Sequence, residues 1–127
     1  MRNFKIRFWI QSSTRYLSFI RQLISTLGPC GVKISKRTAF RCATAMVEAV
    51  DNAIFHAHKQ DVAKEIGIGI EVCCGRVKME VKDNGKGFDI EETQSPNLYD
   101  SGGRGLFIIK SLTNKMRYEN NTLRMWL

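Results

Sequence analysis

The 127-residue sequence has no long apolar stretch. No segment approaches the roughly 18–20 consecutive apolar residues that a membrane-spanning helix needs. The chain start, Met1 to Arg7, runs directly into an alternating pattern and lacks the apolar core of a signal peptide. We therefore expect a cytoplasmic protein with no membrane partner. A chain of this length forms about one domain with one core, so residues 1–127 are predicted to be a single domain.

The four cysteines lack the C-x-x-C spacing of common zinc sites. They are Cys30, Cys42, Cys73 and Cys74. If the adjacent pair lies on a strand, its two side chains point to opposite faces of the sheet. The sequence therefore predicts free thiols and no zinc site.

Acidic residues are absent from residues 1–47, which contain nine Lys or Arg residues. Residues 48–127 contain eleven basic and twelve acidic residues, so the first third carries the whole excess behind the net charge of +8. A surface of one sign attracts acidic partners, whether protein, nucleic acid or anionic lipid. The alternative is an ordinary solvated face.

The two commonest phosphate-binding loops are also absent. The sequence contains no G-x-x-x-x-G-K-[ST] motif, and Gly103-x-Gly105 lacks the third glycine of the dinucleotide-binding fingerprint. His56 and His58 diverge on a helix, so they do not suggest a shared metal ion. His56 is better explained as a group at a helix end.

Periodicity predicts five strands and three helices. The predicted strands are 3–10, 66–73, 76–82, 116–119 and 122–127, with tight turns at Cys74-Gly75 and Asn120-Asn121; the predicted helices are 12–27, Ser35 to about Ala57, and about Gly105–Asn114. Ser12 or Ser13 can cap the first helix and Ser35 the second. The second helix has a predicted core-facing stripe made of Phe40, Ala43, Val47, Val50 and Ile54.

Three short segments carry candidate site residues. Glu48 and Asn52 are four residues apart, which places both side chains on one side of a helix, where they can hold a metal ion and orient a nucleophile. Asp83 follows a strand and precedes Gly85 and Gly87, so a carboxylate is presented where a ligand can come close. This arrangement suits recognition of a base.

The third segment is the glycine cluster Gly102-Gly103-Arg104-Gly105, which leads into an apolar helix beginning with Leu106. Glycines at a helix N-terminus leave backbone N–H groups free to face a phosphate. Together the three segments suggest a purine nucleoside phosphate and Mg²⁺.

Each segment also has an ordinary structural explanation. Glu48 and Asn52 can be part of a solvated helical face, and the glycines near Asp83 and Gly103 can be simple turns. Lys86 and Arg104 can be solvated charges or can meet phosphates. The loop of about residues 88–102 has no stable period, and so long a loop in a small domain is usually functional or disordered.

In their order and spacing, the motifs E-x-x-x-N-A-x-x-H, D-x-G-x-G-F and G-x-G-L resemble the N, G1 and G2 boxes of the GHKL ATPase superfamily. The small size and the segment Gly103 to Ile109 resemble the bacterial anti-sigma-factor serine kinases within it. The resemblance implies a histidine-kinase-like ATPase fold. That fold is a two-layer α/β sandwich with a mixed, mainly antiparallel sheet and helices on one face.

The resemblance also implies roles for individual residues. Glu48 would be the general base on a substrate serine, and Asn52 would ligate Mg²⁺. Asp83 would accept the adenine amino group of ATP, with Gly85 and Gly87 permitting close approach. The G2 segment, here Gly103, Arg104, Gly105 and Leu106, would wrap the phosphates together with an ATP lid at about residues 88–105.

Glu48 favours serine over histidine as the phosphate acceptor. Sensor histidine kinases usually carry asparagine at this position, whereas a serine hydroxyl must lose its proton as it attacks the γ-phosphorus. The expected function is an ATP-dependent serine kinase that phosphorylates an anti-anti-sigma (STAS-type) protein and sequesters a sigma factor. Similar proteins dimerise, so the resemblance suggests a homodimer without direct nucleic-acid contact. The alternatives are a switch kinase acting on a stress-signalling scaffold and a basic nucleic-acid-binding module, for which we identify no exposed aromatic platform.

Overall fold

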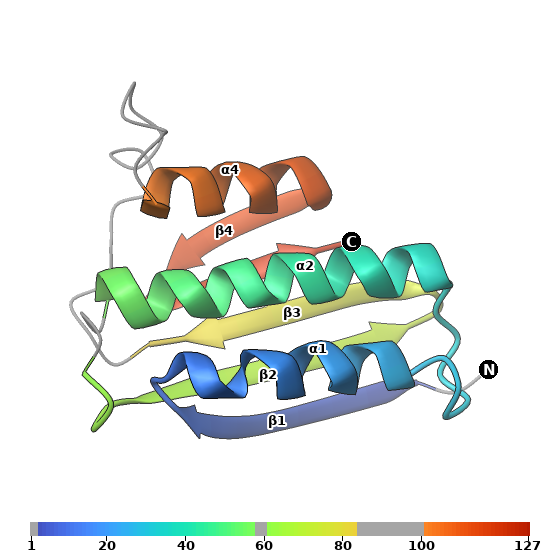
Figure 1. Ribbon diagram of the computed structural model, residues 1–127. Coiled ribbons are helices and arrows are strands. Elements are labelled where there is room, and N and C mark those ends of the chain that lie inside the picture. The colour runs from blue at the N-terminus through green and yellow to red at the C-terminus, as the bar shows by residue number, and fades with distance from the viewer. Residues whose placement is uncertain (1–2, 58–60, 84–100) are drawn as a thin grey trace.

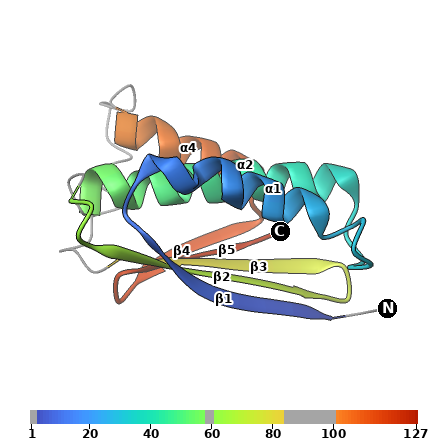
Figure 2. The ribbon, with the colours of Figure 1, turned by 60° about the horizontal axis from the view of Figure 1, so that its bottom comes forward.

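The computed structural model describes residues 3–57, 61–83 and 101–127, and the side chains of residues 56, 57 and 101–104 are not described. The chain forms two layers, a sheet and a layer of helices that covers one of its faces (Figures 1 and 2). The elements are β1 (Phe4–Gln11), η1 (Thr14–Tyr16), α1 (Leu17–Thr26), α2 (Lys36–Asn52), η2 (Ala53–Ala57), β2 (Glu65–Cys73), β3 (Arg76–Lys82), α4 (Ser101–Leu112), β4 (Lys115–Glu119) and β5 (Thr122–Trp126). This is the expected two-layer α/β arrangement.

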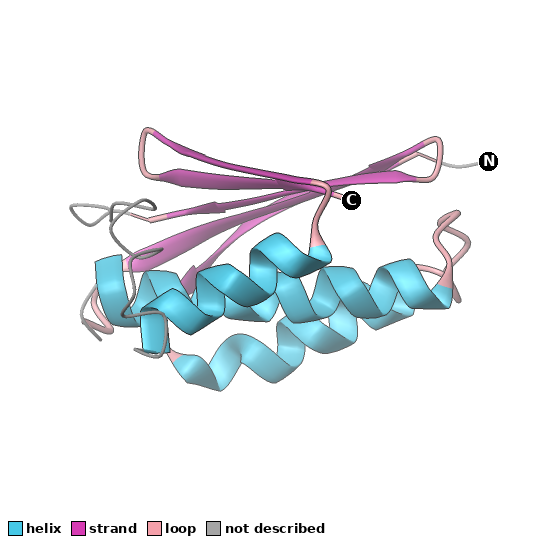
Figure 3. Ribbon diagram, turned by 90° about the horizontal axis from the view of Figure 1, so that it is seen from above, coloured by secondary structure: helices cyan, strands magenta, loops and turns pink. Residues whose placement is uncertain are grey.

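The sheet has the strand order β1-β2-β3-β5-β4. Every pairing among the described strands is antiparallel, so the expected parallel component of a mixed sheet is absent from this part of the chain. Two of the four pairs, β2–β3 and β4–β5, are hairpins, which can only be antiparallel. Strand β1 pairs with β2, although α1 and α2 lie between them in the sequence. The helices lie together on one side of the sheet (Figure 3).

The core lies between the sheet and the helices. Alternate strand residues point inward, as a period of two requires. The most deeply buried of these are Ile66, Val72, Met79 and Met125, which are at most 1% exposed. The opposite face of the sheet carries the charged residues of the same strands and is not covered by the described helices (Figure 2).

The predicted capping serines lie at the start of η1, which leads into α1, and at the start of α2, whereas α1 itself begins after Tyr16 without a side-chain cap. The Ser13 hydroxyl accepts a hydrogen bond from the Arg15 N–H, and Ser35 accepts one from the Thr38 N–H at 3.0 Å. Two residues of the predicted α2 stripe are not buried in the core, because Phe40 is 66% exposed and Val47 is only half-buried. The buried face of α2 is centred on small residues and Met46, and it leaves Phe40 at the edge of the contact with α1.

Two helix boundaries differ from the sequence prediction. The regular α2 ends at Asn52 and continues as one π-helical turn, Ala53–Ala57. Helix α4 begins at Ser101 and not at Gly105, so the glycine cluster lies inside its first turns. Glycine has poor helix propensity, and the sequence therefore favours a later start. No helix among the described residues is long and apolar enough to cross a membrane.

Both hairpin turns have left-handed backbone at residues other than glycine. Asn120 and Asn121 have φ values of 53° and 58°, which asparagine tolerates well. Cys74 has a φ of 55° and is followed by Gly75 at 77°. Cys74 is therefore in the predicted turn and not on a strand, so the condition under which its side chain and that of Cys73 would point to opposite faces is not met.

Candidate functional site

The candidate site lies at one end of the two layers, where α2 ends, α4 begins and β3 ends (Figure 1). Glu48 and Asn52 come from the last turns of α2, Gly105 from the first turns of α4, and Asp83 from the residue after β3. The structure thus brings together residues from all three sequence segments. Gly85 and Gly87, and residues 84–100 of the expected lid, lie outside the described residues.

Gly105 packs directly against the two candidate residues of α2. A Cβ atom added at Gly105 would lie 2.8 Å from Asn52 Oδ1 and 3.2 Å from Glu48 Oε2. Real Cβ atoms essentially never come within 3.0 Å of a packed neighbour, so a side chain at Gly105 would displace Asn52 or the helix. Glycine is thus needed here for the close approach of α4 to α2. The side chain of the next residue, Leu106, is 1% exposed and packs in the core.

Asn52 is buried and incompletely satisfied. It is only 4% exposed, and its Nδ2 atom has no hydrogen-bond partner among the residues that the structure describes. A buried polar group without a partner costs stability, and such groups are rare unless a ligand or water completes them. The Asn52 amide therefore fits a group that an external ligand completes.

The donor set also fits Mg²⁺. The amide oxygen of Asn52 and the carboxylate of Glu48 are oxygen ligands, which Mg²⁺ prefers. The described residues contain no cluster of three or more His, Cys, Asp or Glu residues that could hold a metal by themselves. Mg²⁺ is commonly held by one or two protein oxygens together with substrate phosphates, so this donor set is sufficient only with a phosphate ligand.

Glu48 is half-buried, and its surroundings raise the pKa of its carboxyl above the usual 4.5. Burial is the largest cause, and the negative charge of Asp51 adds to it. The positive charge of Arg21 on α1 acts in the opposite direction. A carboxylate with a raised pKa is a stronger base, which suits proton transfer from a hydroxyl.

Asp83 is held in a buried position between two strands. It is 2% exposed, its N–H donates to the carbonyl of Asn121 at 2.9 Å, and its Oδ2 accepts a hydrogen bond from the Tyr118 hydroxyl at 3.0 Å. Tyr118 lies on β4 and orients the carboxylate. Sequence reasoning missed it because the two residues are 35 positions apart and no spacing connects them.

The C-terminal end of α4 is also hydrogen-bonded to α2. The Arg41 guanidinium donates to the backbone carbonyl of Leu112, the last residue of α4, at 2.7 Å. A cation at this position satisfies a terminal carbonyl and complements the helix dipole. Contacts at Gly105 and at Leu112 therefore set the orientation of α4 on α2.

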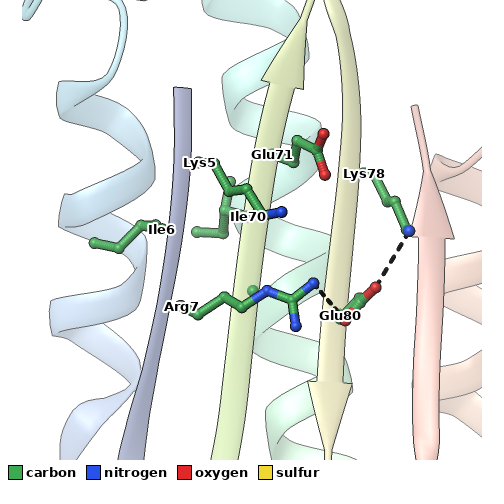
Figure 4. Close-up of a pocket in the computed structure, with 8 residues that line it drawn as sticks. Lys5, Ile6, Arg7, Ile70, Glu71, Lys78 and Glu80 are labelled. Atoms are coloured by element: carbon green, nitrogen blue, oxygen red, sulfur yellow. Dashed lines mark ion pairs between the residues drawn. The ribbon is translucent and has the colours of Figure 1, made fainter. Parts of the chain in front are cut away.

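The open face of the sheet is a second polar surface. Glu80 on β3 is surrounded by Arg7, Lys78 and Arg124, at 3.9, 3.3 and 3.4 Å, and Figure 4 shows the first two pointing toward it. Burial opposes ionisation of Glu80, but the hydrogen bond from Lys78 and the three positive charges outweigh it and lower the pKa. The nearby Trp9 is 54% exposed, so an exposed aromatic ring that the sequence did not reveal is present.

Comparisons with known proteins identify the family to which the chain is similar. The chain matches the family model described as the histidine kinase-like ATPase domain over residues 10–127. Serine-protein kinase RsbW of Bacillus subtilis is 30% identical over 61% of this chain and 55% of its own length. The anti-sigma F factor of Clostridium botulinum is 34% identical over 61% of this chain and 58% of its own length.

A longer alignment joins the chain to serine-protein kinase RsbW of Staphylococcus epidermidis. The two are 31% identical over 84% of this chain and 74% of the relative. The chain thus spans between a little over half and about three quarters of the length of these three relatives. The family match covers nearly all of the described residues and includes the α2, β3 and α4 segments of the candidate site. The chain therefore belongs to the histidine kinase-like ATPase domain family.

Proposed function

We propose that this protein is an ATP-dependent serine protein kinase and anti-sigma factor that phosphorylates an anti-anti-sigma protein and sequesters a sigma factor. The observation that carries the proposal is the packing of Gly105 against Glu48 and Asn52. In this proposal Glu48 is the base and Asn52 the metal ligand. The names of the relatives, serine-protein kinase and anti-sigma F factor, support the choice of activity.

In this proposal each residue has a separate task. Asp83, fixed by Tyr118, accepts a hydrogen bond from the adenine amino group. Asn52 holds Mg²⁺ through its amide oxygen, and Mg²⁺ supplies neutralisation of the phosphate charge. The N-terminal end of α4, whose first turns contain Gly103, Arg104 and Gly105, would face the phosphates, because the helix dipole favours anions at this end. Glu48 accepts the proton of the substrate serine hydroxyl as the serine oxygen attacks the γ-phosphorus.

The transfer reaction tests the proposal with labelled ATP and a purified anti-anti-sigma protein. Glu48→Gln keeps the side-chain shape and removes the base, so transfer should fall by ~10²-fold or more while ATP affinity changes little. Asn52→Ala should reduce both phosphoryl transfer and ATP affinity. Glu65→Gln, the same substitution at an exposed strand residue, is the matched control. Wild-type transfer by Glu48→Gln would show that another group is the base.

The proposed surface for the sigma factor is the groove between α1 and α2. It has a volume of about 530 Å³ and is lined by Arg21, Gln22, Ser25, Pro29, Lys36, Ala39, Phe40 and Ala43. Its floor is apolar, Phe40 is exposed at its edge, and its charged residues are all basic. An acidic partner with an apolar anchor matches this combination of charge and shape.

Association kinetics test this surface. Arg15 is exposed at the start of the same helical layer, and Arg15→Glu should slow association with an acidic sigma factor, most strongly at low salt. Phe40→Ala should speed dissociation, whereas Phe107→Ala, which removes an equally exposed ring from α4, should not. Arg21 is a poor choice for this test because its charge also acts on Glu48. If the first two variants bind like the wild type, the groove is not the sigma-binding surface.

A further inference from the structure

The turn between β2 and β3 consists of only two residues, Cys74 and Gly75. Cys73 and Arg76 are register partners at the end of the hairpin. Both turn residues have positive φ, 55° and 77°, as a type I′ turn requires. Asparagine, aspartate or glycine normally occupies the first of these positions, and a cysteine held there calls for a functional explanation.

The turn brings the two thiols together. On a regular strand, adjacent side chains would point to opposite faces, but the left-handed backbone at Cys74 redirects its side chain. The two Sγ atoms are 3.7 Å apart, and the Cys73 thiol donates to the Cys74 sulfur. Both residues are exposed, so the pair is accessible from solvent. It lies at the end of the sheet opposite the candidate nucleotide site (Figure 1).

This geometry suits chelation better than a disulfide. Neighbouring Cα atoms are about 3.8 Å apart across a trans peptide, which is shorter than the roughly 4.4–6.8 Å that disulfides favour. A disulfide between adjacent residues is therefore strained and easily reduced. Two thiolate bonds of about 2.3 Å to a tetrahedral metal instead place the sulfurs about 3.8 Å apart. The observed separation of 3.7 Å is close to that span.

We propose that Cys73 and Cys74 form a bidentate thiolate site for a soft, thiophilic centre, such as a d¹⁰ metal ion or trivalent arsenic. The described residues offer no cluster of three or more His, Cys, Asp or Glu side chains, so the remaining coordination positions belong to solvent or to substituents that the ligand carries. The hydrogen bond to Cys74 raises the pKa of the Cys73 thiol, and the charge of Cys74, desolvation and the charge of Glu71 add to it in that order. A bound cation replaces the protons and relieves this repulsion.

A monosubstituted trivalent arsenical is the most selective probe, because it needs two thiols. Phenylarsine oxide reacts with the two cysteines to give a cyclic dithioarsenite and one water molecule. Two As–S bonds form, the bond from arsenic to oxygen breaks, and both thiol protons leave with that oxygen. No electrons are exchanged, so the step needs no oxidant or reductant.

The experiment measures adducts by intact-protein mass spectrometry with phenylarsine oxide and then with Cd²⁺. We expect one arsenical per chain, retained in excess monothiol and released by a dithiol competitor. Cys73→Ser and Cys74→Asn should each release the arsenical at least ~10²-fold faster, because only one bond remains. Asparagine suits the left-handed position, so the second variant keeps the turn intact. Cys30→Ser, which removes a separate exposed thiol, is the matched control and should behave like the wild type.

The outcomes separate the two classes of ligand. Binding of both Cd²⁺ and the arsenical, each lost in the Cys73 and Cys74 variants, supports a general soft-metal site. Arsenical binding alone supports a site for trivalent arsenic. An adduct that survives Cys74→Asn, or that excess monothiol removes from the wild type, overturns the proposal. ATP binding should be unchanged in every arm, so this result is independent of the proposed kinase activity.

Discussion

Replacing Gly105 with alanine tests the contact between α4 and α2. The new Cβ would lie 2.8 Å from Asn52 Oδ1 and 3.1 Å from its Nδ2 atom. Because Asn52 is 4% exposed, its amide cannot swing into solvent without disturbing the packing around it. Either the amide rotates away from its position beside Glu48 or the start of α4 moves outward.

The effect on folding should be small compared with the effect on the site. Alanine is favoured over glycine within a helix by about 1 kcal/mol. Overpacking a buried contact costs about 1–3 kcal/mol, so the two terms partly cancel. We therefore expect a net loss of between about 0 and 2 kcal/mol in the free energy of unfolding. A displacement of about 1 Å at catalytic groups can reduce a rate by ~10²-fold, so phosphoryl transfer should fall far more than stability.

Two assays separate these effects. Thermal unfolding with and without Mg·ATP reports the stability of the fold and the stabilisation by ligand, and transfer of labelled phosphate reports the chemistry. Gly69→Ala is the matched control, because its Cβ would lie 3.6 Å from the Glu80 Cβ, an ordinary contact. If Gly105→Ala retains wild-type stabilisation by Mg·ATP and wild-type transfer, the glycine contact does not position Asn52 and Glu48 for catalysis.

Three further predictions concern individual side chains. Asp83→Asn should weaken ATP binding by ~1.5–3 kcal/mol, the value of a hydrogen bond to a charged group, and calorimetry showing equal ATP and GTP affinity in the wild type would contradict the adenine assignment. Tyr118→Phe removes the hydroxyl that binds Asp83 Oδ2 and should weaken ATP binding by about 1 kcal/mol, with a folded protein by circular dichroism. The raised pKa of Glu48 means that the folded state binds its proton more tightly, so stability is lost as pH rises from 4.5 through the folded-state pKa. Glu48→Gln should remove that loss in thermal unfolding measured across this pH range, and an unchanged pH profile would contradict it.

The sequence predicts the fold well where one residue pattern decides it. Alternation and helical period place all five strands and three helices, because each has one buried face whose spacing is visible in the sequence. The exposed Phe40 shows a limit of prediction from helical period. The period of α2 identifies an apolar stripe, but how much of that stripe is covered depends on the angle at which α1 crosses it.

Contacts between residues that are distant in the sequence are a second feature that sequence patterns do not predict. Arg41 binds the Leu112 carbonyl across 71 positions, and no local pattern connects the two residues. The sequence predicts the turn at Cys74-Gly75 but not the direction of the Cys74 side chain, because periodicity assumes extended backbone and Cys74 has a left-handed one. The close approach at Gly105 is predicted only in part. The sequence motif identifies the glycine as a site residue, but only the structure shows that it packs against Asn52 and Glu48.

The charge of Arg21 connects the groove between α1 and α2 to the base of the candidate site. Arg21 lines the groove and also lowers the proton affinity of Glu48. An acidic partner group that pairs with Arg21 would screen this effect, and the Glu48 pKa would rise further. By thermodynamic reciprocity, protonation of Glu48 must strengthen binding of that partner by the same factor. Because protonated Glu48 cannot accept a proton, an acidic partner in the groove would oppose proton transfer by the proposed base through a single guanidinium, without any movement of the backbone.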